Sequence, residues 1–182
     1  EALLTIQTPL SDDGVIALPD ALVEARAERA RRSFAYFVRL VRPEFDVQWF
    51  HELMIREMQG SGTAKRDTRL GIAIPSGHAK TEYCLLFMSW LVIRDPTMQL
   101  KYVTYSATRA KEVMIRLKAI LNDDALRGYF GRVVRATSQR DPDKVNNAEN
   151  VSLLQGPGFI HMTGFGGNIT GSRCDLVVID DP

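Results

Sequence analysis

Hydrophobic and polar residues are arranged so that helices are expected early in the chain, and strands alternating with helices after them. Residues 1–19 interrupt short apolar stretches with prolines and a glycine, a pattern typical of an extended arm. From Asp20 onward, a run of strong helix formers predicts a helix that ends at Pro43. A second helix is predicted over residues 47–58, and the glycines at 60–62 predict a turn after it.

The rest of the chain alternates short apolar runs with helical patterns. The run 69–74 is followed by a proline and a glycine, which predicts a buried strand ending in a tight loop, and 81–93 predicts a helix buried on most sides. Further predicted elements are a strand at 100–105, helices at 108–122 and 125–130, a loop around 141–150, an antiparallel hairpin of 151–155 with 159–162, and a β run at 175–179. This alternation predicts an α/β fold with a twisted, mainly parallel sheet.

The composition is that of an ordinary globular domain. A length of 182 residues suffices for one domain with a full core. The net charge of +1 gives no global positive field, so any contact with nucleic acid must come from a local patch or from regions outside this chain. The two cysteines, Cys84 and Cys174, favour reduced thiols in a cytoplasmic setting over a disulfide framework. The longest apolar run, 84–93, is about half a membrane span, so no membrane crossing is expected. The first residues do not have the pattern of a signal peptide, so none is expected either.

The segment 75–81, PSGHAKT, follows the predicted strand and opens the predicted helix. A bound polyphosphate needs backbone N–H groups converging on its oxygens, a cation near the β- and γ-phosphates, and a hydroxyl for Mg²⁺. The loop would supply the backbone N–H groups, Lys80 the cation and Thr81 the hydroxyl. Glycine is usual where this chain has Ile74 and Ala79, so the match is partial. The alternative is a solvent-facing lysine at an ordinary strand–helix turn.

Two carboxylates, Asp180 and Asp181, directly follow the apolar run 175–179. Carboxylates at the end of a buried strand are costly unless they do something such as binding a cation. In a P-loop site the first acid holds the Mg²⁺ shell and the next one polarises the attacking water. An apolar run before two aspartates also occurs by chance, but loop and acids together predict one nucleotide site. The chain begins with Glu1 instead of methionine and ends at Pro182, directly after these two acids. We therefore expect this chain to be a piece of a longer protein.

Four segments in register resemble the large terminase subunits of tailed bacteriophages, the ATPases that drive genome packaging. They are QWFHEL at 48–53, PSGHAKTE at 75–82, YVTYSAT at 102–108 with the helix after it, and the stretch 163–182 that ends DLVVIDDP. The resemblance covers about residues 45–182. It implies a P-loop NTPase domain of the RecA-like, ASCE class over 45–182, incomplete at its C-terminus and without a nuclease domain, with 1–44 as an N-terminal arm and helix.

The resemblance also implies a function, Mg-ATP hydrolysis coupled to movement of double-stranded DNA into a viral procapsid. Lys80, Asp181 and Arg116 are expected to be catalytic, with Arg116 as an arginine finger, and Thr81 and Asp180 are expected to hold Mg²⁺. The expected nucleotide-binding set is Gln48, His51, Pro75, Ser76, Gly77, His78, Ala79, Lys80 and Thr81. Expected partners are double-stranded DNA, the portal protein, the small terminase subunit and further copies in a ring, a pentamer in the family. The expected location is the host cytoplasm, transiently at the portal vertex.

The chain departs from the family pattern at Asp181, where many such ATPases have glutamate. Either Asp181 serves through a bridging geometry, or the catalytic acid lies beyond Pro182. The resemblance itself leaves two other functions open. One is a different nucleic-acid-dependent P-loop ATPase, such as a helicase or recombinase relative, and the other is a nucleotide-binding or partner-binding module that does not turn over.

Several side chains carry two interpretations each. His78 either touches phosphate or braces its loop, and His51 either contacts adenine or packs within its helix. His161 is interpreted as structural. Arg109 and Arg173 are alternatives to Arg116 as the finger, and any one of the three is equally an ordinary surface arginine. Both cysteines are interpreted as packing residues, because no histidine or cysteine partner has ligand spacing.

Overall fold

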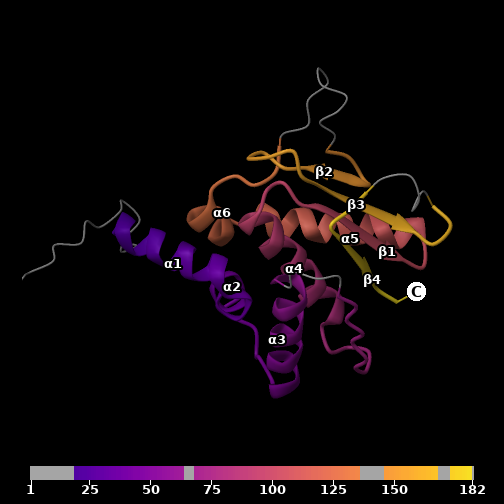
Figure 1. The fold of residues 1–182 in the computed structure, drawn as a ribbon, viewed down its shortest axis with the longest axis horizontal. Helices are drawn as coiled ribbons and strands as arrows, with labels where there is room; N and C mark the ends of the chain where they lie inside the picture. Colours follow the sequence, from indigo (N-terminus) through magenta and orange to yellow (C-terminus); the bar gives the residue numbers. More distant parts are fainter. Residues whose placement is uncertain (1–18, 64–67, 136–145, 168–172, 182) are drawn as a thin grey trace, which may run out of the picture.

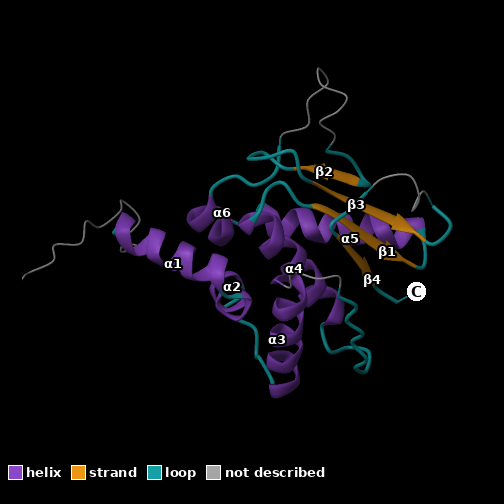
Figure 2. Ribbon diagram, in the orientation of Figure 1, coloured by secondary structure: helices purple, strands orange, loops and turns teal. Residues whose placement is uncertain are grey.

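The computed structural model describes residues 19–63, 68–135, 146–167 and 173–181, and these ranges form a mixed α/β fold (Figures 1 and 2). The elements in chain order are α1 (Asp20–Arg32), α2 (Phe34–Val41), α3 (Trp49–Thr63), α4 (Lys80–Arg94), β1 (Gln99–Thr104), α5 (Ala107–Leu121), α6 (Asp124–Phe130), β2 (Asn150–Ser152), β3 (Phe159–Gly164) and β4 (Leu176–Ile179). Of the helices in these ranges, none has the length and apolar character needed to cross a membrane.

The strands form one sheet in the order β2-β3-β1-β4, within the described ranges of the chain. β1 runs parallel to both β3 and β4, while β2 pairs antiparallel with β3. The predicted mainly parallel sheet and the predicted hairpin are therefore both confirmed, although β2 is shorter than expected. Parallel strands place their carboxyl ends at one edge of the sheet, so Thr104, Gly164 and Ile179 end on the same side.

One face of the sheet belongs to the hydrophobic core. Leu100 and Tyr102 on β1 lie opposite Ile160 and Met162 on β3, and all four side chains are buried. α5 packs against β1 and β3 from this side (Figure 1). Side chains alternate along a strand, so Val178 of β4, which pairs with Tyr102, packs against the same core.

α4 is the central helix, as its apolar sequence predicts. It contacts α1, α2, α3 and α5, and its side chains from Leu85 to Val92 are all buried. The indole N–H of Trp90 donates to the carbonyl of Ala30 at 2.9 Å, which joins α4 to α1. One core cluster thus extends from Ala27 in α1 to Met162 in β3.

The single helix predicted from Asp20 is in fact two helices, so this prediction is wrong at Ser33. Ser33 is extended, with φ −132° and ψ 114°, and its hydroxyl accepts from the N–H of Tyr36 as the cap of α2. The N–H of Phe34 donates to the side chain of Gln59 on α3 at 2.7 Å. A serine that offers its own acceptor competes with helix continuation, and propensity alone did not reveal that.

Two further predictions are corrected. The turn expected at 60–62 is the last turn of α3, which runs on to Thr63. The strand expected at 69–74 does not join the sheet. It is not buried as a whole either, since Ile72 and Ile74 pack against the core while Gly71 and Ala73 are exposed. A strand also needs a neighbour for its backbone, and no strand of the described sheet pairs with this segment.

Some predictions fall outside the described residues. These are nearly all of the arm at 1–19, half of the loop at 141–150, the centre of the glycine-rich stretch before β4, and Pro182. The division into an N-terminal arm and helix over residues 1–44 and an ATPase domain over residues 45–182 stays a prediction.

Candidate nucleotide site

The segment 75–79 is a loop that turns into α4 at Lys80, as the sequence predicts. Gly77 has φ 81° and Ala79 has φ 57°, so the loop turns through two left-handed positions. The N-termini of α2, α5 and α6 are each capped by a side chain, whereas α1 and α4 have no side-chain cap. The first amides of a helix have no partner within it. Those of α4 therefore remain available to an anion, which the helix dipole favours.

Lys80 reaches back over the loop that precedes it. Its ammonium donates to the carbonyl oxygens of Ile74 at 2.7 Å and Pro75 at 3.2 Å. To reach a phosphate, the side chain must exchange these carbonyls for phosphate oxygens.

Asp180 joins the carboxyl end of β4 to the N-terminus of α4. The Thr81 hydroxyl donates to Oδ2 of Asp180 at 2.6 Å, and the Tyr102 hydroxyl donates to the same oxygen at 2.5 Å. The backbone N–H of Asp180 donates to the carbonyl of Val103 at 2.9 Å, so the main chain is held as well. Asp180 is buried, with 8% of its surface exposed. The two sequence segments that predict a nucleotide site are thus in direct contact.

Thr81 and Asp180 fit the needs of Mg²⁺. A hydroxyl oxygen and a carboxylate oxygen at hydrogen-bond distance are hard oxygen donors that one cation can share. Mg²⁺ is usually held by one or two carboxylates together with substrate phosphates and water, not by an all-protein cage.

A cleft of about 470 Å³ lies beside this contact. β4 and Asp180 form one wall, Leu70 and Ile72 of the detached segment form another, and Lys80 is at its edge. Cys84 of α4 also lines it, and burial, followed by the charges of Asp180 and Asp181, raises the pKa of its thiol to about 12. A thiol with this pKa is protonated at neutral pH, which fits the packing role expected from the sequence.

Of the two residues expected around the base, His51 contacts the loop and Gln48 contacts His51. The ring of His51 stacks on Tyr83 with centroids 4.9 Å apart. Its Nδ1 accepts from the backbone N–H of Gln48 at 3.2 Å, which leaves Nε2 to donate to the carbonyl of His78 at 3.4 Å. The Gln48 side chain bonds Asp46, at 2.5 Å. His51 therefore connects α3 to the loop.

His78 is exposed, and its Nδ1 lies 3.0 Å from the carbonyl of Ser76, a contact that braces the loop. His161 lies outside this region, since its Nδ1 is 2.9 Å from the side chain of Asn150 on the neighbouring strand. Burial, followed by the charge of Lys101, lowers the pKa of His161. These contacts agree with the structural interpretation of His161.

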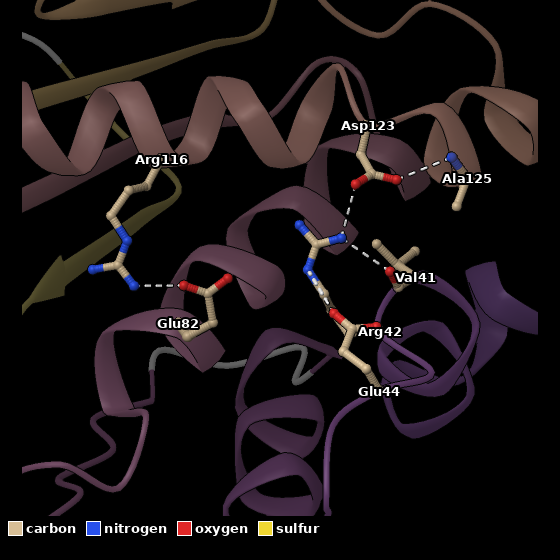
Figure 3. Close-up of polar contacts among 7 residues, drawn as sticks. All are labelled: Val41, Arg42, Glu44, Glu82, Arg116, Asp123 and Ala125. Carbon is tan, nitrogen blue, oxygen red and sulfur yellow. Dashed lines mark hydrogen bonds and ion pairs between the residues drawn. The ribbon is translucent and has the colours of Figure 1, made fainter.

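Arg116 on α5 forms an ion pair with Glu82, and Figure 3 shows the two side chains meeting between the helices. The distance from Nη2 to Oε2 is 2.6 Å. Glu82 follows Thr81 in the first turn of α4, so Arg116 is connected to the loop helix of its own chain. Arg109 pairs with Glu112 one turn along α5, and Arg173 is exposed. Glu82 is a partner that the sequence did not single out.

Asp181 follows Asp180 directly and is exposed, with φ 46°. Aspartate tolerates this left-handed conformation better than most residues.

Comparison with known proteins does not assign this chain to a family. The chain matches no family model, and no curated protein matches its sequence.

Proposed function

We propose that this chain binds and hydrolyses Mg-ATP as the motor domain of a viral terminase large subunit, with a P-loop NTPase fold of the RecA-like class. The observation that carries the ATPase activity is the 2.6 Å contact between Thr81 and Asp180. It brings a loop-and-helix anion site and an acidic strand end together, although they are far apart in the sequence. The packaging role rests on the resemblance of four segments to terminases.

The roles follow from the chemistry of each group. The uncapped amides at the start of α4 bind phosphate oxygens, and Lys80 neutralises charge developing on the β- and γ-phosphates. Thr81 and Asp180 would hold Mg²⁺, which when bound neutralises charge on the phosphate oxygens. Asp181 orients the attacking water.

The nucleotide set extends beyond these groups. Pro75, Ser76, Gly77, His78 and Ala79 form the loop. His51 contacts this loop and Gln48 contacts His51, and both would contact the base. Arg116 would act as an arginine finger. In this role it must leave Glu82 and reach the nucleotide of a neighbouring subunit.

The proposed partners are double-stranded DNA, the portal protein, the small terminase subunit and further copies of the chain in a ring. The proposed location is the host cytoplasm, transiently at the portal vertex. A net charge of +1 does not drive DNA binding globally. Contact with DNA would therefore come from local basic patches or other regions of the full protein.

The decisive first experiment is nucleotide binding. We expect Lys80→Ala to weaken Mg-ATP affinity by about tenfold or more, because a hydrogen bond involving a charged group contributes about 1.5–3 kcal/mol. The matched control is Lys111→Ala, an exposed lysine on α5, which should bind like the wild type. Titration with a fluorescent ATP analogue measures both affinities. Equal affinity for the two variants would contradict the assignment of Lys80 to the nucleotide site.

The motor role is tested separately with the full-length protein. Phosphate release should rise when double-stranded DNA and portal protein are added together. ATP-dependent strand separation would instead favour a helicase relative. Tight ATP binding without phosphate release under any of these conditions would favour the non-catalytic alternative.

A further inference from the structure

Tyr102 makes a contact that the proposed catalytic and binding residues do not account for. Its hydroxyl donates to Oδ2 of Asp180 at 2.5 Å, the same oxygen that accepts from Thr81 at 2.6 Å. Thr81 approaches from α4 and Tyr102 from β1, so the carboxylate is held between a helix and the sheet. Tyr102 itself is fully buried.

The register of the sheet explains how Tyr102 reaches Asp180. Tyr102 pairs with Val178, and Asp180 lies two residues further along, on the same face. A diagonal neighbour of this kind is within reach of a long aromatic side chain. The ring packs in the core between Met162 and Val178, and its position there is fixed by its neighbours.

The phenol is the donor in this hydrogen bond, and the carboxylate oxygen is the acceptor. A hydrogen bond to a charged carboxylate is roughly twice as strong as a neutral one.

We propose that Tyr102 is a positioning residue that fixes the orientation of the Asp180 carboxylate and thereby sets the affinity of the site for Mg²⁺. This inference rests on the proposed function, because it concerns the cation that Thr81 and Asp180 would hold. Groups that orient a metal ligand commonly alter metal affinity by about 10- to 100-fold when removed. Tyr102 does so from the sheet, independently of the phosphate loop.

The test is Tyr102→Phe, which removes one oxygen and keeps the ring. Affinity for the fluorescent ATP analogue mant-ATP is measured in EDTA and then with Mg²⁺ or Mn²⁺ titrated into the complex. We expect unchanged affinity in EDTA and about tenfold weaker cation affinity. The matched control is Tyr105→Phe, whose ring is 60% exposed and which should titrate like the wild type.

A double-mutant cycle separates positioning from a general loss of packing. In an Asp180→Asn background the carboxylate is already gone, so adding Tyr102→Phe should not weaken cation binding further. If the two effects simply add, Tyr102 acts through the core and the inference is wrong.

A measurement on the wild-type protein covers the case in which Tyr102→Phe does not fold. With all five tyrosines labelled with ¹³C at Cζ, the Tyr102 resonance is identified by elimination from Tyr→Phe variants at the other positions. It should shift when Mg²⁺ is added to the nucleotide complex. No shift overturns the inference.

These outcomes also distinguish the two proposals. Wild-type protein that binds no nucleotide contradicts the proposed function itself. Wild-type protein that binds Mg-nucleotide, together with a Tyr102→Phe variant of equal cation affinity, contradicts only the role of Tyr102.

Discussion

At the scale of single residues, the backbone of the loop at 75–79 is strained at Ala79. It adopts φ 57° and ψ 21° directly before α4, a conformation in which a Cβ atom costs about 1–3 kcal/mol. Glycine is common at this position in phosphate loops, and this chain has only Gly77, at φ 81°, to share the turn. The loop is therefore held in shape by its contacts, among them the bonds of Lys80 to Ile74 and Pro75.

We expect Ala79→Gly to leave the free energy of unfolding unchanged or to raise it by up to about 1 kcal/mol, because it removes the Cβ strain. The matched control is Ala119→Gly in α5, which should lose about 1 kcal/mol because its backbone is helical. Urea unfolding followed by circular dichroism measures both. Equal losses for the two variants would show that Ala79 is not strained.

At the scale of elements, α3 and α4 approach each other more closely than ordinary side chains allow. A Cβ atom on Gly62 would lie 2.6 Å from Cζ of Phe87 and 3.1 Å from Cδ2 of Leu91. This contact explains why Gly62, which predicts a turn, lies within a helix instead. The last turn of α3 is stabilised by packing against α4, which outweighs the low helix propensity of glycine.

Gly62→Ala should therefore lower the free energy of unfolding by about 1–3 kcal/mol, since Phe87 must move within a packed core. Gly60→Ala, two residues earlier in the same helix, meets nothing within 4 Å and should raise it by up to about 1 kcal/mol. Thermal and urea unfolding compare the two variants. The close approach would be disproved by stabilisation at both positions.

At the scale of the whole molecule, the N-terminal helices and the sheet share one core. Trp90 of α4 is fully buried. Its ring packs at a tilt against Phe34 of α2, with centroids 5.4 Å apart, and its indole N–H donates to the carbonyl of Ala30 in α1. The same helix carries Thr81 at its N-terminus. The site that joins α4 to β4 therefore depends on a helix packed against residues well before the phosphate loop.

Trp90→Phe should lower the free energy of unfolding by about 2 kcal/mol, from lost volume and the lost hydrogen bond to the carbonyl of Ala30. We expect amide hydrogen exchange to accelerate equally in α1, α2 and β1, because one core unfolds as one unit. Trp49→Phe is the control, since Trp49 is 76% exposed and should change little. Faster exchange confined to residues 20–41 would instead support an N-terminal region that unfolds separately.

The sequence by itself determined the features that depend on neighbouring residues. Apolar periodicity identified α4 and β1, and the hairpin of β2 with β3 followed from its turn residues. The loop at 75–79 and the acids after β4 were visible because phosphate and cation chemistry requires particular residue types in a short stretch. The sequence therefore predicts Lys80, Thr81 and Asp180 as site residues.

Only the tertiary structure decided the features that depend on partners distant in the sequence. Whether residues 69–74 join a sheet depends on a neighbouring strand. Whether Gly62 lies within a helix depends on the packing of α3 against Phe87 of α4. Tyr102 became a candidate only through the register that sets it opposite Val178, and Arg116 met Glu82 only through the packing of α5 on α4. Local patterns specify which backbone conformation is favourable, but a hydrogen bond between elements exists only once the chain has brought both partners together.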